Sequence, residues 1–213
     1  LGGALGNLVG GIASTVLGGL FGKTSQKVMA SGLYAGSQSL GSVLETGLNL
    51  QQYADVATTK KSWFSKSTTN STQYASANQE LENQFGLIFT GFYDSIVSAS
   101  GALSANTEEV KKKLQDAIIN IGKIDLKGLN GEQIQERLEA VFGAAADSLA
   151  QQGFDGLEDF QTVGEGYYET LIKVATGVEQ ATYFTDRLNV TAIAYTEVLN
   201  KQGDVAAEIV RQS

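Results

Sequence analysis

Residues 53–74 read YADVATTKKSWFSKSTTNSTQY, and this stretch decides the fold class. Two runs rich in Thr, Ser, Val and Tyr, residues 53–59 and 67–74, flank a basic and aromatic stretch at 60–66. β-Branched and aromatic residues favour strands, and a short polar stretch between two such runs favours a hairpin. We therefore predict a β-hairpin whose tip is residues 60–66.

The sequence on either side of this hairpin completes an α+β prediction. Residues 27–34 and 42–50 have the same composition and are expected to be strands. Beyond the hairpin, apolar residues recur every three or four positions, which predicts helices. The expected helices are 74–100, 107–121, 131–152, one from 155 to 181, and a final pair at 190–199 and 205–210, with a short strand at 122–128. Capping pairs mark three helix starts: Asn106 with Glu109, Asn130 with Gln133, and Asp155 with Glu158.

The hairpin tip carries the chain's only Trp, Trp63, next to Phe64 and between lysines. Hairpin tips are normally exposed to solvent. Either the two rings fold under the tip or pack on a neighbouring subunit, or they form an aromatic contact for a partner or a lipid headgroup. We take Trp63 and Phe64 as candidate interface residues.

Residues 1–22 contain no charged side chain, and eight of the 22 are Gly. As a helix this segment would span about 33 Å, close to the thickness of a bilayer core. Interior glycines disfavour an isolated helix in water by about 1 kcal/mol each, so the segment needs a partner or a membrane. A close-packed buried helix, a membrane-entering segment and a flexible apolar linker all remain open. The residues expected to pack axially or in a membrane are Leu5, Gly6, Leu8, Val9, Gly10, Ile12, Val16, Leu17, Leu20 and Phe21.

A heptad-like pattern runs through the helix predicted from residue 155. It fits a core-facing helix of one subunit and a coiled-coil contact between subunits equally well. The candidate interface residues on this seam are Leu157, Phe160, Gly164, Tyr167, Leu171, Val174 and Val178. The chain is therefore expected to have three parts: an apolar helix at 1–23, a hairpin region at 24–76 and a helical domain at 77–213.

Composition excludes several classes of chemistry. The 213 residues include no His, Cys or Pro, so the sequence contains no Cys/His zinc site, Ser-His-Asp triad or Cys-His nucleophile. Residues 1–79 carry five bases and two acids (+3), and residues 80–213 carry ten bases and 21 acids (−11). The acidic part should repel a phosphate backbone, so specific nucleic-acid binding is not expected.

Two apparent motifs do not support catalysis. The Gly-Lys-Thr at Gly22, Lys23 and Thr24 lacks the earlier glycine of a phosphate-binding loop, because that position is Leu17. No pair of carboxylates stands out as the catalytic pair of a glycosidase either, because the acidic residues lie at predicted helix starts or on polar helix faces. These pairs are Glu108 with Glu109, and Glu158 with Asp159, with Glu165 close by. We expect neither enzyme activity nor a cofactor or metal.

The order of the parts resembles the C-terminal region of tail tape measure proteins of long-tailed, non-contractile bacteriophages. Residues 163–175 (VGEGYYETLIKVA) and 192–204 (AIAYTEVLNKQGD) carry the resemblance best. It implies a homotrimer inside the tail tube that governs tail length and contacts the distal tail and baseplate hub proteins at the tail tip. It also implies that apolar segments help DNA to cross the host envelope on infection. The expected location is therefore the virion, inside the tail tube at the tail tip, and then the host cell envelope during infection.

The chain starts at Leu1 and its only Met is Met29, so we expect it to be part of a longer polypeptide whose tail-length ruler lies upstream. Two other classes remain open. A pore-forming or fusion-type protein would also explain the apolar run, and it would lyse protein-free vesicles. A muramidase would require wall-degrading activity that depends on one particular Glu or Asp.

Overall fold

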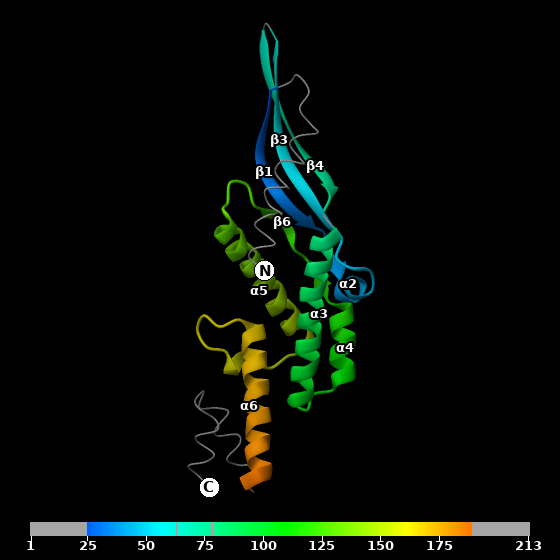
Figure 1. Ribbon diagram of the computed structural model, residues 1–213, viewed down its shortest axis with the longest axis vertical. Coiled ribbons are helices and arrows are strands. Elements are labelled where there is room, and N and C mark those ends of the chain that lie inside the picture. Colours follow the sequence, from blue (N-terminus) through cyan, green and yellow to red (C-terminus); the bar gives the residue numbers. More distant parts are fainter. Residues whose placement is uncertain (1–24, 63, 78, 189–213) are drawn as a thin grey trace. The chain divides into compact units, whose positions relative to one another are not determined.

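A computed structural model describes residues 25–62, 64–77 and 79–188 (Figure 1). Helices and antiparallel strands are both present, so the predicted α+β class is confirmed. The chain divides into two compact units, whose boundaries follow residues 38, 41, 87, 118 and 142. Two of these boundaries fall within helices α3 (Gln79–Ala102) and α5 (Gly131–Gly153). We call the unit that contains the described residues among 25–38, 42–87 and 119–142 the sheet unit. The unit that contains the described residues among 39–41, 88–118 and 143–188 is the helical unit.

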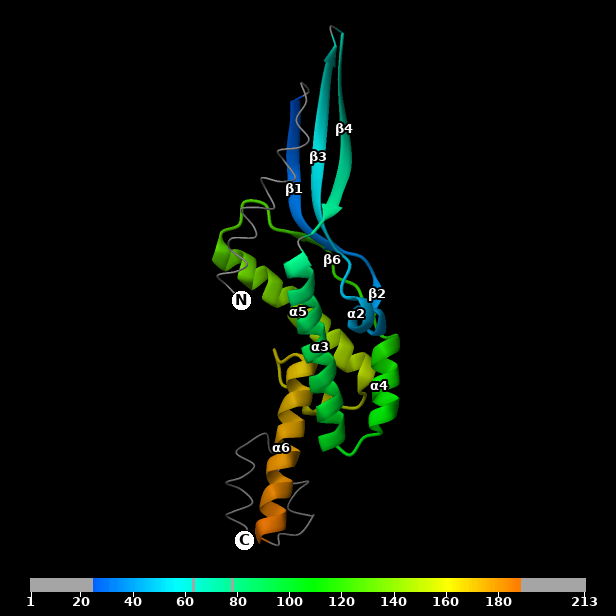
Figure 2. The same cartoon turned by 45° about the vertical axis from the view of Figure 1, so that its right-hand side comes forward.

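The sheet unit is built on a four-stranded sheet in the order β4-β3-β1-β6, in which all neighbours are antiparallel. Figures 1 and 2 show β4 at the outer edge, next to β3. A second, two-stranded sheet pairs β2 with β5. The strands are β1 (Ser25–Ala35), β2 (Gln38–Ser39), β3 (Leu50–Ser62), β4 (Ser65–Ser76), β5 (Ile118–Ile119) and β6 (Gly122–Asp125).

The predicted hairpin is confirmed as β3 and β4, but its tip is shorter than expected. The strands pair without a register shift from Gln51↔Ser76 to Ser62↔Ser65, so most of the expected tip is paired strand. Ser and Thr tolerate the extended backbone and form cross-strand pairs, which is why pairing continues past the lysines. The strand predicted at 27–34 is β1, and the one predicted at 122–128 is β6, which ends at Asp125.

Alternation along the strands turns one face of the sheet toward a core. Leu33, Leu50 and Ala54 are buried there, with 0 to 1% of their surface exposed. In the same unit, Phe85 of α3 meets Phe142 of α5 edge to face, with ring centroids 4.8 Å apart. These apolar contacts explain why residues 81–89 repeat at helical spacing.

The strand predicted at residues 42–50 is wrong. Residues Leu40–Thr46 form helix α2, and only Leu50 belongs to a strand. Leu40 and Val43 are buried at a spacing of three, which is a helical period that the Ser and Thr content masked. Gly47, at a φ of 86°, ends the helix, and its N–H donates to the carbonyl oxygen of Val43.

Two of the three predicted helix caps are confirmed. Asn106 caps α4 (Thr107–Asp116), and its side chain accepts a hydrogen bond from the N–H of Glu109. Asn130 and Gln133 form a reciprocal capping box at the start of α5, with distances of 2.9 and 3.0 Å. Helix α4 is shorter than predicted because Ala117 is extended and the β-branched Ile118 and Ile119 form β5. Helix α3 likewise starts at Gln79, because residues 74–76 belong to β4.

The continuous helix predicted from residue 155 to 181 is wrong over residues 155–166. Residues Glu158–Phe160 form a short 3-10 turn, η1, which has no side-chain cap, and α6 (Tyr167–Leu188) begins only after a loop. Gly156 and Gly164 have φ angles of 90° and 86°, which break an α-helix. The apolar residues of this loop therefore recur at helical spacing although the segment does not form a helix.

Several predictions lie outside the described residues. These are the apolar segment at 1–22 with its axial or membrane residues, the Gly-Lys-Thr motif, Trp63, and the helices expected at 190–199 and 205–210.

Candidate functional site on the sheet

A polar cluster joins three strands of the sheet unit. Asp55 of β3 lies directly opposite Thr72 of β4, and the Thr72 hydroxyl donates to Asp55 Oδ1 at 2.5 Å. Lys123 of β6 donates from Nζ to both carboxylate oxygens of Asp55, at 2.8 and 3.0 Å, and to the Thr72 hydroxyl at 3.1 Å. Since β1 lies between β6 and β3, the long Lys123 side chain reaches across one strand. The cluster thus connects both edges of the sheet.

These contacts fix the charge on Asp55. Its hydrogen bond with Lys123 is the main cause that holds the pKa of Asp55 below its usual range, and the hydrogen bond with Thr72 adds to this effect. A carboxylate whose pKa is lowered stays ionised at neutral pH and does not supply a proton there.

Tyr53 is the aromatic centre of the same face. It pairs with Gly32 of β1 and with Tyr74 of β4, and only 1% of it is exposed. Lys123 Nζ lies 4.9 Å from its ring centroid. Burial, followed by the negative charges of Asp125 and Asp55, raises the pKa of Tyr53 to about 12. The phenol therefore remains protonated at neutral pH and is not an activated nucleophile.

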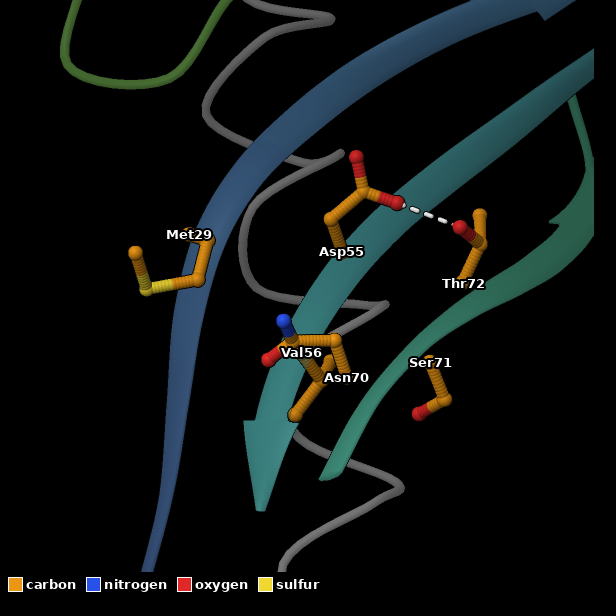
Figure 3. A pocket seen from close by; sticks show the side chains of 6 residues that line it. All are labelled: Met29, Asp55, Val56, Asn70, Ser71 and Thr72. Atoms are coloured by element: carbon orange, nitrogen blue, oxygen red, sulfur yellow. Dashed lines mark hydrogen bonds between the residues drawn. The ribbon is translucent and has the colours of Figure 1, made fainter. Parts of the chain in front are cut away.

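An open hollow of about 370 Å³ lies beside the cluster, with walls from β1, β3 and β4 (Figure 3). In Figure 3 the Asp55 side chain turns toward Thr72, to which it is hydrogen-bonded. The lining residues are Met29, Asp55, Val56, Asn70, Ser71 and Thr72. Asp55 is already paired with Lys123, and the other side chains that line the hollow are neutral. It suits a neutral polar contact better than a charged small molecule.

Of the acidic residues considered for glycosidase chemistry, Glu108, Glu109 and Glu165 form ion pairs in the helical unit. Glu158 and Asp159 lie exposed in η1. Glu108 accepts a hydrogen bond from Lys111 at 2.7 Å, and Glu109 lies 3.5 Å from Lys113. Both partners are on the same helix at spacings of three and four, which is the usual arrangement on a solvated helix face.

Glu165 is the most strongly held of these acids. Lys173 Nζ donates to both of its carboxylate oxygens at 2.6 Å, and the N–H and hydroxyl of Thr162 donate to Oε2 at 3.0 and 2.8 Å. The Lys173 contact first, and then the Thr162 backbone, lower the pKa of Glu165 to about 2. The carboxylate closes the turn before α6 and is not available as a general acid at neutral pH.

A second hollow, of about 350 Å³, lies in the helical unit, between α3 and α6. Asp94 of α3 and Glu179 of α6 are among its lining residues, with Ser95, Ser98, Ala99, Ile172, Ala175 and Thr176. Two acids alone do not make a metal centre, and no group of three or more candidate ligands occurs within residues 25–62, 64–77 and 79–188. In the same ranges, none of the helices combines the length and the apolar character needed to cross a bilayer.

The candidate interface residues of the heptad pattern lie in the helical unit. Leu157, Tyr167 and Leu171 are buried in the unit's own core, at 3% exposure or less. The Tyr167 hydroxyl donates to the carbonyl oxygen of Phe154 at 2.9 Å and accepts from the N–H of Leu157. Phe160, Val174 and Val178 are half-buried, and Gly164 is exposed in the turn before α6. The residues that an interface could still use are thus the three half-buried ones and the exposed Gly164.

Phe64 is 93% exposed at the end of the hairpin, so its ring does not fold under the tip. In the hairpin below it, β4 is exposed at every residue except Gln73. The hairpin therefore presents a long polar strand and one large apolar ring to the surroundings.

The polar cluster was not predicted from sequence. Asp55, Thr72 and Lys123 are far apart in the chain, and only the strand register brings them together. The available signal was the presence of Asp55 and Lys123 within strands, but β3 also carries Lys60 and Lys61, and β6 also carries Asp125. Charged strand residues are more often solvated, so nothing in the sequence singled out this pair.

Comparisons with protein-family models, with curated proteins and with solved structures find no match for this chain.

Proposed function

We propose that this chain is a structural component of a bacteriophage tail tip, corresponding to the C-terminal region of a tape measure protein. The resemblance in residues 163–175 and 192–204 suggests the family. In this role the protein governs tail length, closes the tube at the baseplate hub and helps DNA to leave the particle through the host envelope.

The long exposed hairpin is the observation that carries the proposal. Strand β3 has 13 residues and β4 has 12, so the hairpin extends for about 40 Å at 3.3 Å per residue. Its end, from the Lys60↔Ser67 pair onward, lies beyond Ser25, the first residue of β1, in the sheet register. A two-stranded ribbon of this kind is marginally stable by itself in water. Contact with other chains in an assembly would stabilise it.

The chemistry of the described residues supports a structural role over a catalytic one. Asp55 and Glu165 have lowered pKa values and paired cations, and Tyr53 has a raised pKa. None of the three is poised to transfer a proton near neutral pH. Each one instead joins segments that are far apart or closes a turn.

The negative charge of the chain supports a role in which the protein lies next to DNA without binding it. Residues 80–213 carry ten bases and 21 acids, so this part repels a passing phosphate backbone. A tail tip must let the genome pass without holding it. We expect the distal tail and hub proteins, and not nucleic acid, to be the partners.

Deletion in the virus tests the function. The codons for residues 25–188 are removed in frame from the genome that encodes the chain, and the particles are imaged by electron microscopy. We expect heads without complete tails, or tails that fail to deliver DNA, and rescue when the intact gene is supplied in trans. Tails of normal length with full infectious yield would refute the proposal.

A further inference from the structure

Strand β4 is an edge strand without the usual protection. Its 12 residues pair with β3 without a bulge, and within the described residues no strand lies on its other side. It contains no Pro and a single charged residue, Lys66. Natural edge strands are usually short, bulged, charged or covered, because open N–H and C=O groups recruit other strands. A long edge without a bulge, such as β4, is a site for strand addition.

The opposite side of the sheet is protected by contrast. Strand β1 has a bulge at Met29, and Lys127 Nζ donates to the carbonyl oxygens of Val28 and Met29 at 2.7 and 3.3 Å. The N–H of Leu126 also donates a hydrogen bond to the carbonyl oxygen of Ser31 at 2.9 Å. A bulge and a lysine are the devices that block edge pairing. One edge of the sheet is protected and the other is not. This difference indicates that the exposed edge of β4 serves a function.

We propose that β4 pairs antiparallel with β4 of a second copy of this chain, about a two-fold axis at Asn70. The two four-stranded sheets would then continue into each other through main-chain hydrogen bonds. Isologous two-fold contacts are the commonest way in which identical chains associate.

The side chains of β4 favour this register. Lys66 lies opposite the partner subunit's Tyr74 when the two copies of Asn70 face each other. Tyr74 is 49% exposed, and an ammonium group is attracted to the face of an exposed aromatic ring. Thr68 lies opposite the partner subunit's Thr72 in the same register, and Thr–Thr pairs stabilise antiparallel strands. These residues are all even-numbered and therefore share one face of the sheet.

Charge selects the antiparallel direction and the identity of the partner. In a parallel, in-register pair the two Lys66 ammonium groups would stack, which is unfavourable. In the antiparallel pair they lie at opposite ends of the interface. The strand offers only Ser, Thr, Asn, Gln, Tyr, Ala and one Lys. It provides no apolar stripe or acidic pattern for a different protein to read, so it best matches a copy of itself.

This inference rests on the edge of β4 and departs from the homotrimer that the resemblance implies. The resemblance implies a homotrimer, whereas isologous pairing of β4 closes at two copies. The mass of the assembly therefore separates the two expectations.

Light scattering after size exclusion, on the full chain in mild detergent, is the first test. We expect the mass of a dimer for the wild type. Asn70→Lys places two ammonium groups against each other at the axis, and should give a monomer whose circular dichroism is unchanged, since Asn70 is exposed. Ser37→Lys adds the same charge at an exposed site away from β4 and should remain dimeric. A wild-type monomer or trimer, or a dimer that survives Asn70→Lys, overturns the proposal.

Disulfide trapping tests the register, because the chain has no native cysteine. Asn70→Cys puts two thiols opposite each other, and we expect at least about tenfold more crosslinked dimer than for Thr68→Cys. In this register the two copies of residue 68 are four residues apart along the strand, about 13 Å, which is beyond disulfide reach. Thr68→Cys is also exposed and on the same face, so it is a matched control. Equal crosslinking of the two variants overturns the register.

Discussion

Asp147 of α5 caps α6 through Tyr168. Its Oδ1 accepts a hydrogen bond from the backbone N–H of Tyr168 at 2.9 Å, in the first turn of α6. Gly166 makes this approach possible, because a Cβ at that position would lie 2.6 Å from Asp147 Oδ1. A carboxylate at the amino end of a helix satisfies an open N–H and interacts favourably with the helix dipole. One residue of α5 thereby helps to determine where α6 begins.

Removal of this cap should weaken the helical unit. We expect Asp147→Ala to lower the free energy of unfolding by about 1 kcal/mol, since the N–H of Tyr168 loses its acceptor. Asp147→Asn keeps an acceptor oxygen and should lose less. Urea unfolding followed by circular dichroism measures both, and equal stability of Asp147→Ala and the wild type would contradict the capping role.

The Glu165 carboxylate should make stability depend on pH in the acid range. Its pKa falls from 4.5 in the unfolded chain to about 2 in the folded chain. A lowered pKa means that the contribution is present above about pH 4.5 and is lost as the pH falls through about 2. Glu165→Gln should therefore be less stable than the wild type at pH 7, and the difference should shrink toward pH 2. A difference that stays constant from pH 7 to pH 2 would exclude ionised Glu165 as its source.

Gly32 should not tolerate a side chain. A Cβ at Gly32 would overlap the carbonyl oxygen of Ile124, a main-chain atom that cannot move without disturbing β6. We expect Gly32→Ala to cost about 2 kcal/mol or more in the free energy of unfolding. Gly91→Ala is the control, because nothing lies within 4 Å of a Cβ there and alanine favours the helix. Equal effects of the two substitutions would refute the close approach of β1 and β6.

Tyr53 should ionise later than an ordinary tyrosine. Its pKa is raised from 10.0 to about 12, so the folded state favours the neutral phenol. This contribution to stability is present below about pH 10 and is lost as the pH rises through about 12. In absorbance titrations after a rapid pH jump, Tyr53→Phe should remove a step near pH 12. An unchanged titration above pH 11 would contradict burial of the ring.

Local signals in the sequence were sufficient for part of the fold. The Asn130–Gln133 box and the Asn106 cap each depend on residues three apart, and both formed as expected. The hairpin was also found, because the strand-forming runs adjoin a short basic tip. Such features require no knowledge of the tertiary structure.

Errors arose where backbone conformation or register decided the outcome. The apolar period through Leu157 and Gly164 resembled a helix, but the positive φ of Gly156 and Gly164 converts it into a loop. The cluster of Asp55 with Lys123 depends on β6 lying two strands from β3. Strand order is a tertiary property, so no local pattern could have placed these two residues together.

Location in the particle tests the proposed role most directly. Antibodies raised against the hairpin of β3 and β4 are applied, with gold labels, to purified virions produced by the genome that encodes this chain, after mild opening of the tail tip. We predict that label gathers at the distal end of the tail and that peptides of the chain are recovered from the particles by mass spectrometry. Particles that are infectious and yet contain no peptide of this chain would contradict the proposal.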